Sequence, residues 1–278
     1  GNGYDTRQAV TYTRWVVAGC CLMIAAVVIV GLKKGAPAQS TQREPFLATM
    51  RVGISEARKP RIMLCYLAAV VSRGDLAVLS TFFTTWLFLE GRDLGMTPTE
   101  AMSGGFKFYI VVQAAALVAA PFIGVMLDKI DRVKGLVVAM VLAAGGYLSL
   151  ALVDNPFGSA MYGAAVLIGF GEIAANLSAL SLVGKEAPAR GRGAVIGMFS
   201  FFGAFGILLT AKLGGILFDD VSRIGPFVLV GIGNIVVLCG ALLAAMLVAT
   251  AALLTAPMLD AAGFTIRWDQ IEAAASFG

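Results

Sequence analysis

The sequence contains no histidine among its 278 residues. This absence excludes Ser-His-Asp triads, Cys-His pairs, haem ligation by imidazole and histidine-bound zinc. A phosphate loop of the G-x-x-x-x-G-K-[ST] type is also missing, which argues against ATP hydrolysis. The cysteines lie inside apolar runs without C-x-x-C spacing, which favours packing over metal or redox chemistry; they are Cys20, Cys21, Cys65 and Cys239. We therefore expect no enzyme activity, no catalytic residue, no cofactor and no metal.

Charge is scarce as well. Only 14% of the residues are charged, whereas soluble domains average about 25%. Hydrophobic residues make up 59% of the chain, and the mean hydropathy is +0.86. A water-soluble fold of this size cannot hide so much apolar surface in one core. The composition therefore predicts a membrane protein.

Seven stretches are long and apolar enough to cross a bilayer, which takes about 20 residues per helix. The sequence thus predicts an all-α membrane protein with a polar linker at residues 33–61, a six-helix domain at 62–250 and a tail at 251–278. We expect the end of the linker, residues 46–51, to form a short amphipathic helix on the membrane face. The predicted spans are 15–32, 62–89, 106–127, 136–153, 158–183, 194–218 and 225–250.

Lysine and arginine are distributed unequally between alternate loops. One set holds thirteen: Lys33, Lys34, Arg43, Arg51, Arg58, Lys59, Arg61, Lys129, Arg132, Lys134, Lys185, Arg190 and Arg192. The other set holds four: Arg7, Arg14, Arg92 and Arg223. Because cytoplasmic loops carry the excess of basic residues, we expect the N-terminus outside and the C-terminal tail in the cytoplasm. This topology accounts for the net charge of +4 without a nucleic-acid partner.

Several polar residues fall inside the spans, where they are costly and usually face a cavity or a partner. Arg73 and Asp75 lie near the middle of the second span, and Glu172 lies in the middle of the fifth with Asn176 on the same helical face. We expect these to form a polar site, although a structural ion pair is an alternative. Four further residues either join that site or serve as interfacial and interhelical groups: Lys107, Gln113, Lys212 and Asn234.

The charged residues within spans are confined to the second, third, fifth and sixth. A polar pathway lined by these four helices and shielded from lipid by the other three explains that division. Abundant glycine in the fifth and sixth spans, such as Gly169 and Gly206, permits close helix approach.

The loop after the third span carries a recognisable motif. It reads Gly124-Val-Met-Leu-Asp128-Lys129-Ile-Asp131-Arg132-Val-Lys134. It resembles the G-x-x-x-D-[RK]-x-G-R-[RK] loop of the major facilitator superfamily, with Asp131 in the place of the usual glycine. In such a loop the aspartate Asp128 can cap the following helix and pair with basic groups at a cytoplasmic gate. The resemblance implies a gate formed by Gly124, Asp128, Lys129, Arg132 and Lys134.

A second segment, from Pro188 through Gly197 to Asp219, is similar to the eleventh helix of these transporters and its approach. The resemblance implies that residues 1–32 hold an outer stub and family helix six, the last of the N-terminal half. The linker then corresponds to the central cytoplasmic loop, and residues 62–250 to helices seven to twelve, built as two inverted three-helix repeats. The first five helices of a complete transporter are absent from the chain, so we expect a missing N-terminal half as a partner.

The leading hypothesis is a portion of a secondary active transporter that moves a small solute by alternating access, with protons as a candidate coupling ion. Substrate is expected at Arg73, Glu172 and Asn176, and the coupling proton at Asp75 or Glu172. We expect the plasma membrane as location, or the inner membrane in a bacterium. A truncated, non-transporting scaffold or partner subunit is the alternative. A retinal protein is disfavoured because the last span has no lysine for a Schiff base.

Overall fold

The computed structural model describes residues 6–31, 46–189 and 191–261, and all regular structure there is helical. It divides into two units. The first contains one helix, α1 (Thr6–Gly31), and the second begins at Phe46 and contains the remaining helices. Lys33, Lys34, Arg43, Arg190 and the part of the tail from 262 to 278 lie outside the described residues.

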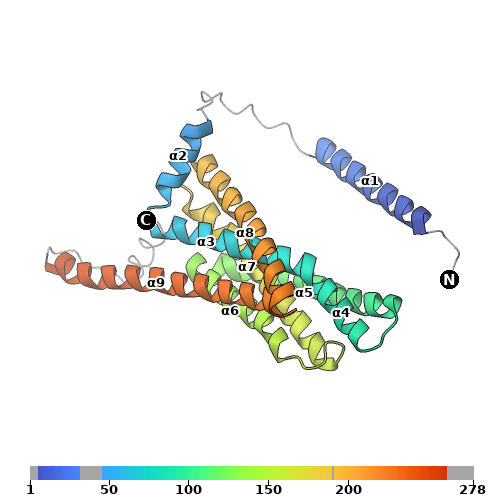
Figure 1. Ribbon diagram of the computed structural model, residues 1–278. Helices are drawn as coiled ribbons and strands as arrows, with labels where there is room; N and C mark the ends of the chain where they lie inside the picture. Colours follow the sequence, from blue (N-terminus) through green and yellow to red (C-terminus); the bar gives the residue numbers. More distant parts are fainter. Residues whose placement is uncertain (1–5, 32–45, 190, 262–278) are drawn as a thin grey trace. The chain divides into compact units, whose positions relative to one another are not determined.

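The second unit is a bundle of long helices (Figure 1). Its elements are α2 (Phe46–Glu56), α3 (Pro60–Val78), η1 (Leu79–Phe83), α4 (Thr84–Asp93), α5 (Pro98–Lys129), α6 (Arg132–Ser149), η2 (Leu150–Leu152), α7 (Ser159–Glu186), α8 (Arg192–Asp220) and α9 (Gly225–Ala261). Seven helices of the described chain are long and apolar enough to cross a membrane, which confirms the predicted all-α membrane fold. The expected helix at 46–51 is present as α2 and is one turn and a half longer than expected.

The second span is longer and less regular than expected. Helices α3, η1 and α4 run on from Pro60 to Asp93 as one 34-residue helix. At 1.5 Å per residue it is about 50 Å long, well beyond the bilayer core of about 30 Å. Its middle, Leu79–Phe83, has π-helical hydrogen bonding, which is uncommon and often found at functional sites. This irregular turn begins four residues after Asp75.

The packing of the spans is symmetric under exchange of two helix triplets. Helix α3 packs on α8, and α5 packs on α7. Let α3, α5 and α6 form one triplet, and let α7, α8 and α9 be their respective counterparts in the other. The α3–α8 contact then corresponds to the α7–α5 contact, and the α6–α7 contact corresponds to the α9–α3 contact. Because each triplet contains three spans, the second begins on the opposite side of the membrane from the first. The arrangement is that of two inverted repeats.

Glycines make the two equivalent contacts possible. A Cβ atom on Gly206 of α8 would lie 2.2 Å from the carbonyl oxygen of Val70 on α3. A Cβ atom on Gly169 of α7 would lie 2.3 Å from the carbonyl oxygen of Val112 on α5. Both obstacles are backbone atoms, so no side-chain movement makes room. Close approach through small residues is the usual way in which membrane helices pack.

Ion pairs tie the helix ends together on both sides of the bundle. Arg61 at the start of α3 lies 3.0 Å from Glu186 at the end of α7, and both side chains are largely buried. At the opposite ends, Arg223 between α8 and α9 lies 2.6 Å from Asp93 and 3.4 Å from Glu90 of α4. The hydrogen bond to Asp93 stabilises the protonated guanidinium and raises the pKa of Arg223.

Candidate functional site

Asp75 of α3 lies in the interior of the bundle and faces α9 and α6. Its side chain is 1% exposed, and Asn234 of α9, which is 0% exposed, donates to both carboxylate oxygens at 3.1 and 3.0 Å. The hydroxyl of Tyr147 on α6 donates to the backbone carbonyl of Asp75 at 3.2 Å. Helices α6 and α9 were expected only to shield the pathway from lipid. Asp75 therefore points toward the helices that carry no charged residue in their membrane-spanning interiors.

Glu172 of α7 is also buried, at 6% exposed, but it has no hydrogen-bond or ion-pair partner among the described residues. Its Oε2 atom is completely enclosed. Asp75 and Glu172 lie on α3 and α7, which pack against each other. That the two carboxylates form one polar site stays a prediction. Buried carboxylates without a compensating cation are costly unless a proton, water or ligand reaches them.

Arg73 lies two residues from Asp75 but on a different side of α3. It is half-buried, and its aliphatic stem packs against α8, since a Cβ atom on Gly203 would lie 2.9 Å from its Cγ. The guanidinium makes no hydrogen bond or ion pair with any residue in the described parts of the chain. Arg73 and Asp75 therefore do not form the structural ion pair that was the alternative reading.

A run of hydroxyl side chains on the same long helix was not predicted from the sequence. Ser80, Thr81 and Thr85 are exposed at and after the π-helical turn, and they follow Arg73 by two to three helical turns. Ser80 donates to the carbonyl of Ala77 at 3.2 Å, and Thr85 donates to that of Thr81 at 2.9 Å. Their hydroxyl oxygens therefore keep free acceptor positions. We call Ser80, Thr81 and Thr85 the hydroxyl stripe; the spacing of serine and threonine in the span was the signal that could have revealed it.

The other predicted pathway residues are less enclosed. Asn176 on α7 and Gln113 on α5 are half-buried, whereas Lys107 on α5 and Lys212 on α8 are exposed. The four residues have no hydrogen-bond or ion-pair partner within the described ranges. They are thus free to contact solvent, lipid headgroups or a ligand.

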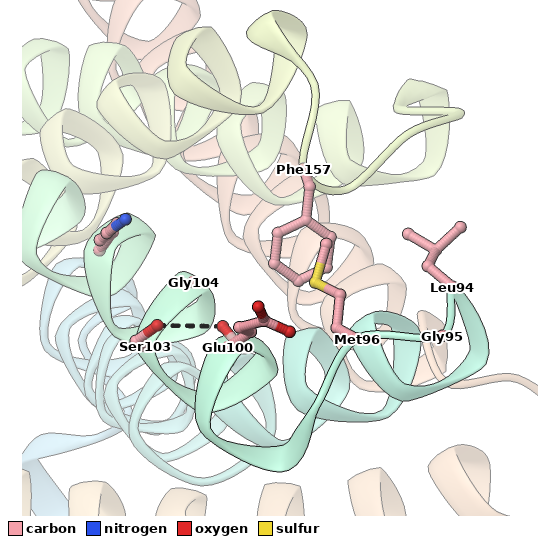
Figure 2. A pocket seen from close by; sticks show the side chains of 8 residues that line it. Leu94, Gly95, Met96, Glu100, Ser103, Gly104 and Phe157 are labelled. Atoms are coloured by element: carbon pink, nitrogen blue, oxygen red, sulfur yellow. Dashed lines mark hydrogen bonds between the residues drawn. The ribbon is translucent and has the colours of Figure 1, made fainter.

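An open hollow of about 550 Å³ lies beside the first turns of α5 (Figure 2). Phe157 from the connection between α6 and α7 faces Met96, and Lys107 belongs to its wall. Glu100 is already engaged in a capping box with Thr97 at the start of α5. The hollow includes neither Asp75 nor Glu172, so it is separate from the buried carboxylates.

The motif after the third span takes a form that differs from the expectation in one respect. Asp128 lies inside α5 and pairs with Arg132 at 3.6 Å, while Asp131 caps α6 by accepting from the backbone of Val133 and Lys134 at 2.9 and 3.3 Å. The cap therefore comes from Asp131, the residue in the usual glycine position, and not from Asp128. Asp131 has φ of −57°, so this turn needs no glycine. Gly124 and Lys129 lie in the last two turns of α5.

These features define a polytopic helical membrane protein with two exchange-related helix triplets around buried and half-buried polar groups. A model of the Major Facilitator Superfamily matches residues 9–211, and the chain belongs to that family.

Three magnetosome proteins are similar to the chain. MamH of Paramagnetospirillum magneticum is 26% identical over 64% of this chain and 42% of its own length. MamZ of the same organism is 27% identical over 72% of this chain and 31% of its own length. MamZ of Magnetospirillum gryphiswaldense is 28% identical over 64% and 28%, respectively. The chain thus corresponds to less than half of each of these relatives.

Proposed function

We propose that the chain is part of a secondary active transporter that moves a small solute by alternating access and couples the movement to protons. Its family supports membrane transport in general. The observation that carries the coupling is Glu172, a buried carboxylate in a membrane span without a partner in the described chain. Asp75 was an equal candidate from the sequence. Its two hydrogen bonds from Asn234 favour Glu172 as the group that exchanges a proton.

The solute, in this proposal, contacts Arg73, Asn176 and the hydroxyl stripe. A half-buried arginine facing lipid in mid-membrane is costly, so its side of the long helix is better suited to a water-filled cavity. The exposed hydroxyls of Ser80, Thr81 and Thr85 continue along this helix. Gln113, Lys107 and Lys212 are proposed to line the route toward the outer side.

The complete transporter, we infer, contains a second six-helix half, and α1 belongs to it as family helix six. The chain's coverage of less than half of its relatives supports this interpretation. The proposed domains remain 1–32, the linker 33–61, the six-helix domain 62–250 and the tail 251–278. Gly124, Asp128, Lys129, Arg132 and Lys134 are proposed to form the cytoplasmic gate.

Orientation and location are part of the same proposal. The basic loops favour a cytoplasmic position for the α5–α6 and α7–α8 connections, with the N-terminus outside. The plasma membrane, or the inner membrane of a bacterium, is the proposed location. The names of the relatives suggest the magnetosome as a second location. Fluorescence of a tagged chain in a magnetosome-forming host tests it.

The decisive experiment compares Glu172→Gln with the unaltered complete protein in proteoliposomes. A panel of small organic anions and neutral solutes is offered under an imposed pH gradient, and solute accumulation is followed together with the pH of the lumen. We expect Glu172→Gln to abolish accumulation driven by the pH gradient while leaving exchange of solute across the membrane. Asp220→Asn, an exposed carboxylate at the end of α8, is the matched control and should behave as the unaltered protein. Unchanged coupling in Glu172→Gln removes this residue from the proposed role.

A non-transporting scaffold or partner subunit is the second candidate, because the chain covers less than half of its relatives. Sequencing the gene upstream of residue 1 separates the two. An in-frame stretch encoding about five further spans supports the transporter, whereas a stop codon and start site immediately upstream support the subunit.

A further inference from the structure

Helix α2 is held against the bundle by one face. Gly53 is buried there, and a Cβ atom on it would lie 2.8 Å from the carbonyl oxygen of Ala194 and 2.3 Å from Met198 on α8. The hydroxyl of Tyr66 on α3 donates to the carbonyl of Gly53 at 2.9 Å. Figure 1 shows α2 beside the beginning of α8. The contact joins α2 to the ends of two spans.

The opposite face of α2 is uncovered. Leu47 is 77% exposed and Ile54 is 53% exposed. Arg51 lies between them on the helix, and Arg58 follows in the turn after it. Leu47, Arg51 and Ile54 are spaced by four and three positions, so they share one side of α2, and Arg58 follows Ile54 by four positions in the turn. We call Leu47, Arg51, Ile54 and Arg58 the outer face of α2.

The two arginines of the outer face are unpaired within the described residues. Arg51 and Arg58 have no ion-pair or hydrogen-bond partner among the residues that the structure describes. The neighbouring Lys59, by contrast, is paired with Glu56 at 2.8 Å. An amphipathic helix with unpaired basic groups and exposed aliphatic side chains is complementary to an anionic phospholipid surface.

Helix α2 lies beside the first turns of two membrane-length helices. Only residues 57–59 separate α2 from α3, where the long apolar helix begins at Pro60. The contact residues Ala194 and Met198 belong to the first two turns of α8, another membrane span. The attachment of α2 to the first turns of two spans supports a position near the lipid headgroups.

We propose that the outer face of α2 is a binding site for anionic phospholipids. Arg51 and Arg58 contact lipid phosphates, while Leu47 and Ile54 insert into the adjoining apolar region. Since the inner face of α2 contacts α3 and α8, lipid binding stabilises the ends of both spans. This proposal concerns a lipid surface and does not depend on the transported solute or on proton coupling.

The test measures hydrogen–deuterium exchange of the segment 46–58 in the complete protein, in nanodiscs of two compositions. One contains only phosphatidylcholine, and the other contains about one-third phosphatidylglycerol. Each arginine near an anionic surface contributes roughly fivefold to binding. We therefore expect clearly slower exchange of this segment in the anionic nanodiscs, and loss of that difference at about 1 M salt, where the Debye length is about 3 Å.

The double variant Arg51→Gln/Arg58→Gln should lose the dependence on lipid charge while its helix remains docked through Gly53. Arg92→Gln/Lys185→Gln removes the same amount of charge elsewhere and should retain the dependence. Equal exchange in both nanodiscs for the unaltered protein overturns the proposal. Equal loss in the two double variants also overturns it, because the effect then reports overall charge and not a site on α2.

Discussion

The two helix triplets are alike in packing and unlike in chemistry. At each of the two equivalent contacts, a glycine of the second triplet meets a valine carbonyl of the first: Gly206 against Val70 and Gly169 against Val112. The first helix of each triplet also carries a buried carboxylate, Asp75 on α3 and Glu172 on α7. The shared architecture therefore creates two comparable places for an acidic group.

The surroundings of those carboxylates differ because the third helices differ. Helix α9 supplies Asn234, whose amide donates to both oxygens of Asp75. On the other side, α6 meets α7 with small residues, since Cβ atoms on Gly146 and Gly171 would collide with Ile168 and Ala143. Glu172 receives no such amide within the described chain. The Asn234 amide thus distinguishes Asp75, a carboxylate with a hydrogen-bond donor, from Glu172, a carboxylate without a partner in the described chain.

The largest expected effect comes from breaking the packing that the triplets share. Gly206→Leu and Gly169→Leu each place a side chain against backbone atoms, so the helices must separate. We expect each to cost about 3 kcal/mol or more and to reduce the folded fraction sharply. Thermal unfolding of the detergent-solubilised protein, followed by size-exclusion chromatography, measures the loss.

Glycines on the same helices provide matched controls. Gly197 on α8 and Gly163 on α7 have no atom within 4 Å of an added Cβ. Leucine at either position should leave the unfolding temperature nearly unchanged. If Gly206→Leu and Gly169→Leu are equally harmless, the close contacts do not hold the triplets together.

A smaller effect is expected from removing the amide that distinguishes the two carboxylates. Asn234→Leu leaves Asp75 buried without its donors and should cost about 2 kcal/mol. The double variant Asp75→Leu/Asn234→Leu removes both polar partners and should recover part of that loss. Denaturant unfolding in detergent micelles measures the free energy of unfolding of the single and double variants. If the losses of the two single variants simply add in the double variant, Asp75 and Asn234 are not coupled by a hydrogen bond.

The spans and the two buried carboxylates could be predicted from the sequence, but the hydrogen-bond partner of Asp75 could not. The spans follow from hydropathy alone, and Asp75 and Glu172 stand out as ionisable groups within them. Which of them has a partner depends on contacts between distant helices: Asn234 is 159 positions from Asp75. The π-helical turn that precedes Thr84 and Thr85 also has no local composition signal, because it depends on how the long helix packs.

The cap of α6, by contrast, depends only on neighbouring residues, even though Asp131 departs from the family motif. Asp131 occupies a glycine position of the motif and uses its carboxylate to satisfy two amides of the next helix. The sequence contains this information because capping is local, with donors two and three residues away. The cap was therefore open to prediction from local positions, although the family motif led us to expect it from Asp128, whereas the pairing of spans had no local signal.

The smallest expected effect on stability is that of Glu172→Gln. No hydrogen bond or ion pair of Glu172 exists within the described residues, so the substitution removes no partner. We expect a change of less than about 1 kcal/mol in the free energy of unfolding, against about 2 kcal/mol for Asn234→Leu. The same denaturant titration checks it. A loss as large as that of Asn234→Leu means that Glu172 holds the bundle together as Asp75 does, and its altered transport then reports misfolding. A stable Glu172→Gln protein that no longer couples solute to the pH gradient makes the asymmetry of the two triplets a functional one.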